Sequence, residues 1–253
     1  MTFRLLETGR NPGAFNMGLD EAILVAVAEG RQPPTLRLYG WDPPAVTLGY
    51  FQGLEDEVDR EACARLGADV VRRVTGGGAV FHDAELTYSL ALPEGHPLAR
   101  PGILDSYRVL CAGVVAGLAA FGLLGEFVPL NDVLVGGRKV SGNAQTRKRG
   151  CILQHGTILL DVDVERMFSL LRVPSEKVKG RLIEDVKQRV TSLRHQLGRP
   201  VDLGEAVSAF AKGFRSALGV DLKPGAPSQE ELDDGRRIAS EKYGTEEWTA
   251  KRR

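Results

Sequence analysis

The chain has 253 residues, 43% of them hydrophobic, and its 33 Lys and Arg balance 33 Asp and Glu, so that the formal net charge is zero. This size and composition fit one large domain with a substantial core. Balanced charge gives no reason to expect indiscriminate binding to nucleic acid or to an anionic membrane. No apolar run approaches the ~20 residues that cross a bilayer, and no signal peptide is visible. We therefore expect a cytoplasmic protein.

The first half of the chain is expected to alternate short strands with helices. Phe3–Leu6 is a short apolar segment, and apolar residues spaced by four from Phe15 to Val27 predict a helix. A charged helix is expected over Leu54–Leu66, and the clearest helix covers Ile103–Phe121. Strand-like runs cover Thr35–Tyr39, Ala45–Phe51, Asp69–Arg73, Ala79–Phe81 and Leu86–Leu92.

The second half begins with a predicted β-hairpin, in which a Gly136-Gly137 turn joins Val133–Val135 to Arg138–Val140. Ile152–Leu160 predicts a strong strand, and the chain is expected to be mainly helical after about residue 162. Strands and helices interleave without a steady βαβ repeat. An α+β fold with a mixed or antiparallel sheet flanked by helices is therefore favoured over a doubly wound one. We expect residues 1–253 to form a single domain.

Three successive glycines, Gly76-Gly77-Gly78, separate two strand-like runs and follow Arg72 and Arg73. Glycine lets the backbone approach a ligand closely and point N–H groups at an anion, and arginines pair with phosphate or carboxylate. A flexible hairpin loop with solvated arginines would show the same pattern. No Gly-Lys-Ser/Thr follows, so the segment is not a Walker loop.

Lys139 lies in the second strand of the predicted hairpin, beside Val140. If Val140 faces the core, then Lys139 faces the opposite side, which can be water or a cleft. An ordinary exposed lysine fits this position as well. The small and polar residues Ser141-Gly142-Asn143 that follow indicate close approach of a ligand.

His155 stands between Gln154 and Gly156 inside an apolar strand. Polar groups in such a strand are unusual, and a hydrogen-bonded core histidine is the ordinary interpretation. Gly156 again indicates a backbone that another group approaches closely.

Taken together, these segments resemble the biotin/lipoate protein ligase superfamily, and most closely its lipoate–protein ligase A branch. The resemblance rests on Arg-Arg-x-Thr-Gly-Gly-Gly-Ala-Val-Phe-His-Asp, on Asn-Asp-Val followed by Arg-Lys-Val-Ser-Gly-Asn-Ala, and on Leu-Gln-His-Gly-Thr. Further matches, in the expected order, lie at residues 16–22, 49–52, 189–193 and 242–248. The resemblance spans nearly the whole chain and implies the catalytic-domain fold of this superfamily.

The resemblance implies a ligase that forms lipoyl-AMP from lipoate and ATP, supplied as its Mg²⁺ complex, and passes the lipoyl group to an acceptor lysine. Lys139 would be the central catalytic and binding lysine. The acceptors would be apo-lipoyl domains of 2-oxoacid dehydrogenases and the glycine-cleavage H protein. The residues implied to bind the substrate or the adenylate are Arg72, Arg73, Thr75, Gly76, Gly77, Gly78, Ala79, Val80, Phe81, His82, Asn131, Asp132, Asn143 and His155.

The main alternative is an octanoyltransferase, in which a cysteine takes the acyl group from acyl carrier protein as a thioester. Octanoyltransferases that resemble this branch usually carry that cysteine in a longer insert before the Lys139 hairpin, and here the segment is short. Of the three cysteines, Cys63 and Cys111 fall within predicted helices. Cys151 is the candidate nucleophile, yet four strand residues place it about 13 Å from His155. The ligase pattern is therefore the better match.

The sequence also bears on an accessory domain, on two further alternatives for the function and on metal sites. Many ligases of this family carry an accessory C-terminal domain, but after Leu193 only about sixty residues remain, which fit two helices and a tail. A separate accessory polypeptide would then be needed for adenylation. A lipoate-binding protein without catalysis is a second alternative, and biotin ligase is disfavoured because its Gly-Arg-Gly-Arg type loop is absent. The cysteine spacing offers no structural zinc site, and we expect no other metal site.

Overall fold

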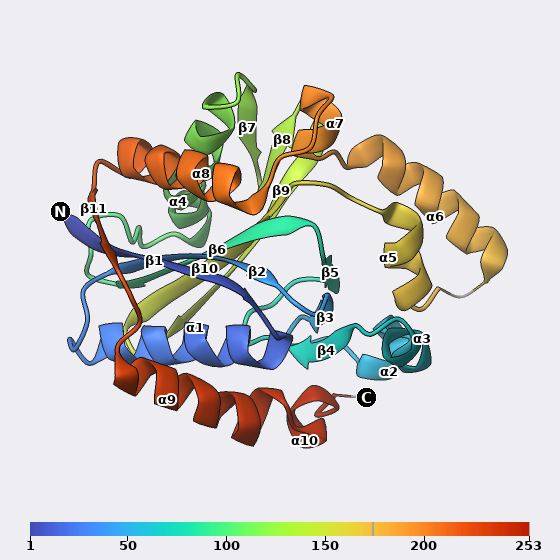
Figure 1. Cartoon of the computed structure of the whole chain (residues 1–253), viewed down its shortest axis with the longest axis horizontal. Coiled ribbons are helices and arrows are strands. Elements are labelled where there is room, and N and C mark those ends of the chain that lie inside the picture. The colour runs from blue at the N-terminus through green and yellow to red at the C-terminus, as the bar shows by residue number, and fades with distance from the viewer. Residues whose placement is uncertain (174, 253) are drawn as a thin grey trace.

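The computed structural model describes residues 1–173 and 175–252, and a large mixed sheet runs through its middle (Figure 1). The strand order is β11-β1-β2-β6-β10-β9-β8-β7. β1 pairs in parallel with β11 and β2, and the remaining neighbours are antiparallel. This confirms the expected α+β architecture. In sheet order the strands are Asp221–Gly225, Thr2–Asn11, Thr35–Trp41, Glu85–Pro93, Cys151–Leu159, Arg138–Lys148, Asp132–Val135 and Gly125–Val128.

A second, three-stranded sheet lies beside the first and carries the glycine run. Its order is β4 (Asp69–Arg72), β3 (Ala45–Leu48), β5 (Val80–His82). β3 is parallel to β4 and antiparallel to β5, so the connection from β4 to β5 forms a loop at one end of this sheet. Residues 73–79 make up this loop, called the glycine loop below.

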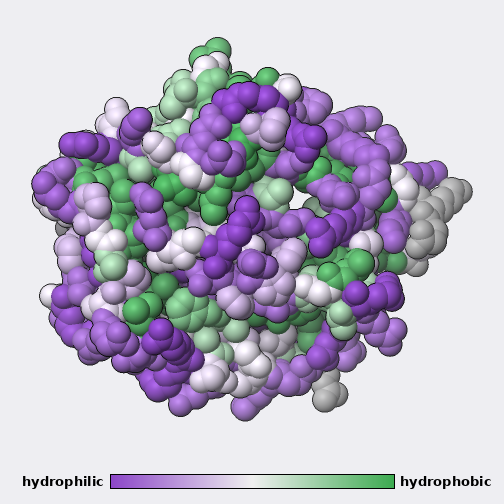
Figure 2. All heavy atoms as spheres, in the orientation of Figure 1, coloured by the Kyte–Doolittle hydropathy of each residue, from purple (hydrophilic) through white to green (hydrophobic). Residues whose placement is uncertain are grey.

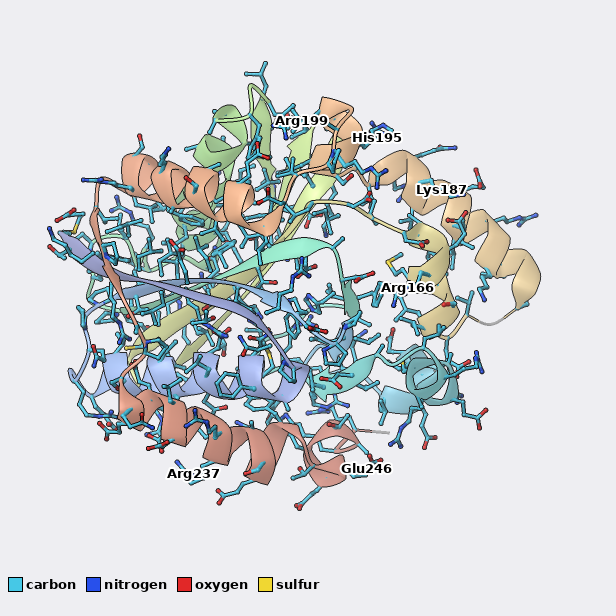
Figure 3. The ribbon with its side chains drawn as sticks, viewed as in Figure 1. Arg166, Lys187, His195, Arg199, Arg237 and Glu246 are labelled. Atoms are coloured by element: carbon cyan, nitrogen blue, oxygen red, sulfur yellow. The ribbon has the colours of Figure 1, made fainter. Side chains whose placement is uncertain are left out.

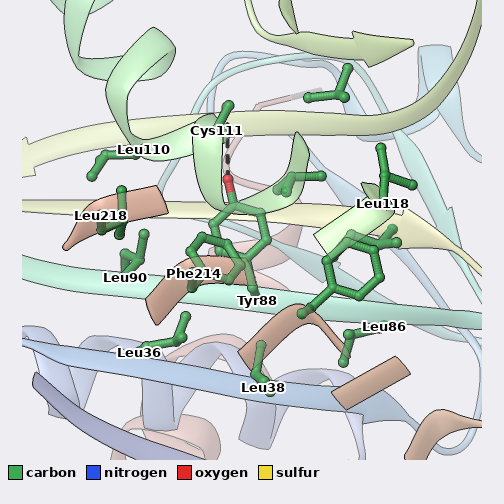
Figure 4. Close-up of a cluster of buried hydrophobic side chains, with 14 of the residues drawn as sticks. Leu36, Leu38, Leu86, Tyr88, Leu90, Leu110, Cys111, Leu118, Phe214 and Leu218 are labelled. Carbon is green, nitrogen blue, oxygen red and sulfur yellow. Dashed lines mark hydrogen bonds between the residues drawn. The ribbon is translucent and has the colours of Figure 1, made fainter. Parts of the chain in front are cut away.

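Helices cover both faces of the large sheet (Figure 1). On one face α4 (Ile103–Ala119) crosses α8 (Leu203–Leu218), and a cluster of leucines closes around Tyr88 and Phe214 (Figure 4). A Cβ added at Gly113 would lie 2.0 Å from the Phe214 ring. Glycine is therefore what lets the two helices meet. On the other face lie α1 (Gly13–Ala28) and, outside it, α9 (Gln229–Ile238).

The remaining helices are short or peripheral. α5 (Val164–Leu170) and α6 (Glu176–Arg189) lie at the end of the molecule near β3 and β5 (Figure 1). Among the described residues, none of the helices is long and apolar enough to cross a membrane. The other helices are α2 (Leu54–Glu57), α3 (Arg60–Arg65), α7 (Leu193–Leu197), the π-helical η1 (Ala239–Tyr243) and α10 (Glu246–Thr249).

One expectation about the elements was wrong. The helix predicted over Leu54–Leu66 is broken into α2 and α3, because Asp59 accepts a hydrogen bond from the Ala62 N–H and caps a new helix. The segment after residue 162 is mainly helical but also contains β11, which its parallel pairing with β1 stabilises. β1 lies more than 200 residues earlier in the chain, so the local sequence around β11 does not predict this strand.

Candidate functional site

A cavity of about 460 Å³ opens between the large sheet, the glycine loop and helices α5 and α6. Figure 2 shows a hollow with hydrophobic side chains on the side of the molecule that carries these two helices. Eleven residues expected to bind the substrate or the adenylate line it: Arg73, Gly77, Gly78, Ala79, Val80, Phe81, His82, Asn131, Lys139, Asn143 and His155. The structure thus brings together three segments that are far apart in the sequence.

Lys139 projects into the cavity from β9. Its Nζ lies 2.7 Å from Oδ1 of Asp132, which starts the neighbouring strand β8. A Cβ added at Gly142 would lie 2.8 Å from Lys139 Cε and 2.9 Å from Nζ, so the lysine stem crosses directly over this glycine. Gly142, three residues after Lys139, therefore leaves the space that the lysine side chain occupies.

Asn131 and Asn143 tie the start of β8 to β9. The side-chain amide of each donates to the backbone carbonyl of the other. The Tyr88 hydroxyl donates to Asn143 Oδ1 at 2.6 Å, which fixes how the amide is oriented. A Cβ at Gly156 would lie 2.0 Å from this Oδ1, so β10 needs glycine where the Asn143 side chain passes.

The glycine loop is held by Arg73 from inside. The buried Arg73 guanidinium donates to the carbonyls of Thr47, Gly76 and Gly78 at 2.7–2.9 Å. Burial lowers the pKa of Arg73 to about 10, which still leaves it charged at neutral pH. Arg73 lines the cavity, but both of its Nη atoms already donate to backbone carbonyls.

Arg72 does not border the cavity, contrary to expectation. It is fully buried, and its guanidinium donates to the carbonyls of Gly49 and Gln52 on one side and of Thr249 on the other. Trp248 Nε1 in turn donates to the Arg72 carbonyl at 2.8 Å. Arg73 directly follows the last residue of β4, and neighbouring side chains of an extended chain point to opposite sides, so only one of the two arginines reaches the cavity.

Thr75 and His155 link the glycine loop to the large sheet. Thr75 Oγ1 lies 2.7 Å from His155 Nε2, and Asp20 Oδ2 lies 3.8 Å from His155 Nδ1. Burial lowers the pKa of His155, only partly opposed by Asp20, so the imidazole is neutral at pH 7. Burial alone would raise the pKa of Asp20, but Arg37 and His155 outweigh it and lower that pKa. Thr75, like Gly76 and Asp132, supports the wall without lining the cavity.

His82 belongs to a buried hydrogen-bonded chain along the cavity wall. Its Nε2 lies 2.8 Å from Thr47 Oγ1, and its Nδ1 lies 2.7 Å from Oε1 of Glu85. The Trp41 ring stacks on the imidazole at 4.1 Å between centroids. Trp41 and Glu85 both line the cavity.

None of the three cysteines, all of which lie in the described part of the chain, lines the cavity. Cys151 is buried at the far end of β10, in the core next to Leu153. Burial raises the pKa of all three thiols, that of Cys63 to about 11 and that of Cys111 to about 12. A raised pKa disfavours the thiolate, so the structure offers no activated cysteine at this cavity.

Several lining residues were missed by the sequence reasoning. Tyr39, Trp41, Thr47, Glu85 and Thr87 line the inner wall, and Met167, Val186 and Val190 come from the α5–α6 side. Polar residues inside the apolar strands β3 and β6 were a signal for Thr47, Glu85 and Thr87. No pattern in the sequence indicated Met167, Val186 and Val190, because only the folded chain places α5 and α6 over the cavity. Figure 3 labels Arg166 on α5 and Lys187 on α6. Arg166 pairs with Asp83, and Lys187 pairs with Glu165.

A sequence model of the lipoyl protein ligase A/B catalytic domain matches residues 12–215. The chain belongs to this family. It is 43% identical to the octanoyltransferase LipM of Kyrpidia tusciae, with 98% of each chain covered. It is 38% identical to the octanoyltransferase LipM of Bacillus subtilis, with 99% of each covered.

Solved structures of the family share the fold. The bipartite lipoate protein ligase of Thermoplasma acidophilum, studied with its E2 lipoyl domain, superposes with a TM-score of 0.90 at 30% identity, covering 100% of this chain and 98% of that one. A lipoate-protein ligase A bound with ATP gives a TM-score of 0.83 at 30% identity, with 99% of each chain covered. Membership of the family makes the chain an enzyme of lipoyl or octanoyl transfer.

Proposed function

We propose that this chain transfers a lipoyl or octanoyl group from an acyl adenylate to a lysine of a lipoyl-domain protein, without a cysteine nucleophile. One observation carries the proposal: Lys139 borders the cavity, whereas Cys63, Cys111 and Cys151 do not. The similar T. acidophilum ligase belongs to a lipoylation system with an E2 lipoyl domain, which supports this class of acceptor.

The reaction forms an amide bond and releases AMP. The acceptor amine attacks the acyl carbonyl carbon, the bond from that carbon to the phosphate oxygen breaks, and the amine loses a proton to solvent. Negative charge grows on the carbonyl oxygen during attack and on the phosphate oxygen as AMP leaves. A fixed cation beside these atoms stabilises that charge, which is the role we assign to Lys139.

The charges around the cavity favour a preformed adenylate over ATP. Arg73 donates to backbone carbonyls, and Arg72 lies outside the cavity. Among the described lining residues, Lys139 is then the basic side chain best able to turn to a phosphate. It matches the single charge of an adenylate better than the several charges of a triphosphate. Adenylation from ATP and Mg²⁺ would then require a separate polypeptide, and the ATP-dependent ligase expected from the sequence stays a prediction.

A second candidate is octanoyl transfer from acyl carrier protein, which the names of the 38–43% identical relatives favour. The stretch matched to the K. tusciae protein is 269 residues, longer than this whole chain, so that relative has residues without a counterpart here. The short segment before β8 is where we expect them. If the short segment before β8 stands where the relative has an insert with the nucleophilic cysteine, this chain would have to transfer the octanoyl group without that cysteine.

Modification of a purified apo-lipoyl domain, read by mass spectrometry, tests both candidates. Lipoyl-AMP, octanoyl-AMP, lipoate with Mg-ATP, octanoyl-acyl carrier protein and no donor are supplied in parallel. We expect modification from the two adenylates and little from lipoate with Mg-ATP. Modification from octanoyl-acyl carrier protein alone would overturn the proposal and establish the second candidate.

A further inference from the structure

We infer that Glu85 is a specificity-determining residue that accepts a hydrogen bond from a neutral donor group of the bound ligand. The inference rests on the proposed function for the class of ligand, an acyl adenylate. Glu85 starts β6, is 1% exposed and lines the cavity. Its Oε1 has two partners, whereas its buried Oε2 has none among the described residues.

The donors on one side of Glu85 are ordered by a hydrogen-bond relay. Arg73 Nη1 donates to Thr47 Oγ1 at 3.0 Å, so the Thr47 hydroxyl hydrogen is free to bond His82 Nε2. A carboxylate oxygen can only accept, so His82 Nδ1 donates to Glu85 Oε1 at 2.7 Å. The Glu85 carboxylate therefore sets the direction of this bond.

The other side of Glu85 is ordered in the same way. Trp41 Nε1, which can only donate, bonds Thr87 Oγ1 at 2.8 Å, so the Thr87 hydroxyl donates to Glu85 Oε1 at 2.6 Å. Both relays end on Oε1. Leaving a buried carboxylate oxygen without a partner costs free energy. Because Glu85 lines the cavity, we place the missing donor on the ligand bound there.

The chemistry of the partner follows from the acceptor. Oε2 can bind an N–H, O–H or S–H group, and an acyl adenylate supplies such a group at either end. Its purine carries an exocyclic amine, and a reduced dithiol tail carries S–H groups, whereas an octanoyl tail has neither. A site that hydrogen-bonds a group of its ligand disfavours the analogue that lacks it.

Glu85→Gln inverts the hydrogen-bonding character of this position without changing its shape. Because His82 and Thr87 both donate to Oε1, the glutamine carbonyl must occupy that place. The glutamine NH₂ then takes the place of Oε2, so an acceptor becomes a donor. A ligand with a donor at this point should lose affinity, and a ligand with an acceptor should gain it.

The test measures calorimetric binding of unreactive acyl-sulfamoyl nucleosides, so it does not depend on turnover. The octanoyl-adenosine analogue is compared with octanoyl-inosine, which replaces the purine amine by a carbonyl, and with dihydrolipoyl-adenosine, which adds thiols. We expect the wild-type chain to prefer the donor-bearing ligand about tenfold in one of the two pairs, and Glu85→Gln to remove or reverse that preference. The responding pair identifies the end of the ligand that Glu85 contacts.

Glu231→Gln is the matched control, because Glu231 is also buried but pairs with Arg4 away from the cavity. It should leave both preferences unchanged. If the wild-type chain shows no preference in either pair, Oε2 has another partner such as water and the inference is overturned, even if Glu85→Gln fails to fold. If none of the nucleosides binds, the proposed function fails instead, which separates the two outcomes.

Discussion

Lys139 Nζ and Asp132 Oδ1 lie 2.7 Å apart, across the hairpin formed by β8 and β9. Their side chains are 40% and 33% exposed, so water screens the pair and it adds little to the stability of the fold. Its consequence is positional. Asp132 holds the ammonium at the border of the cavity until a phosphate or carbonyl oxygen of a ligand competes for it.

Lys139→Met should lower the rate of acyl transfer from octanoyl-AMP by about 10³-fold, which corresponds to about 4 kcal/mol of lost transition-state stabilisation. The melting temperature should stay almost unchanged, because the ion pair is screened. Single-turnover mass spectrometry of the acceptor measures the rate. Lys148→Met, on the same strand but outside the cavity, is the control and should behave like the wild type. Retained transfer in Lys139→Met would remove this lysine from the mechanism.

Gly142→Ala should displace the lysine rather than remove it. The added methyl group would lie 2.8 Å from Lys139 Cε, so the stem must move aside. We expect a loss of at least about tenfold in the transfer rate, since misplacing a catalytic group by about 1 Å can cost 10²-fold. Gly180→Ala is the matched control, because its methyl group meets no atom within 4 Å and lies in helix α6. Equal rates in both variants would show that the path of the lysine side chain is unimportant.

A chain in which Cys63, Cys111 and Cys151 are all replaced by alanine should still transfer the acyl group from octanoyl-AMP, within about threefold of the wild-type rate. Each thiol is buried away from the cavity, so its loss leaves a small void costing about 1 kcal/mol. Cys111 Sγ also contacts the Tyr88 hydroxyl and the Gln154 amide, and these two groups keep their bond to each other when the thiol is removed. Circular dichroism and thermal melting check the fold. Loss of transfer in Cys151→Ala, with melting intact, would instead assign the reaction to a cysteine.

Acidification should destabilise the fold partly through His155. Burial lowers its pKa in the folded chain below the ordinary 6.5, so the unfolded chain takes up a proton first as the pH falls. The contribution of His155 to stability is therefore complete above about pH 6.5 and is lost as the pH drops toward the folded-state pKa. Melting temperatures between pH 8 and pH 5.5 should fall less in His155→Gln than in the wild type. His96, whose pKa burial also lowers, keeps some slope in the variant. An identical slope in both proteins would contradict this assignment.

The sequence was sufficient for features that depend on local pattern. Alternation predicted Lys139 opposite Val140, and a glycine run between strands predicted the loop that borders the cavity. It was insufficient where distant segments decide the outcome. Glu85 lines the cavity together with Trp41 and His82, and the three residues meet only after β2, β5 and β6 assemble. Periodicity alone predicted one continuous helix over Leu54–Leu66, whereas the chain forms two helices there, of which Asp59 caps the second.

Arg72 shows the same limit most clearly, because its motif indicates a ligand contact while its side chain joins two parts of the backbone. The guanidinium bonds the turn at Gly49 and Gln52 to the C-terminal Thr249. A Cβ at Gly49 would lie 1.9 Å from the Gly77 carbonyl oxygen, so this turn packs directly under the glycine loop. The C-terminal segment therefore supports the cavity through Arg72.

Arg72→Met should lower the free energy of unfolding by about 3 kcal/mol or more, because several buried carbonyls lose a charged donor together. Urea unfolding measures this loss, and hydrogen exchange should rise at residues 246–252 and in the glycine loop. Arg60→Met is the control, because it removes the exposed Arg60–Glu246 pair that touches the same C-terminal segment and should change little. If exchange rises at the C-terminus but stays unchanged in the glycine loop, then the segment is anchored by Arg72 without supporting the cavity.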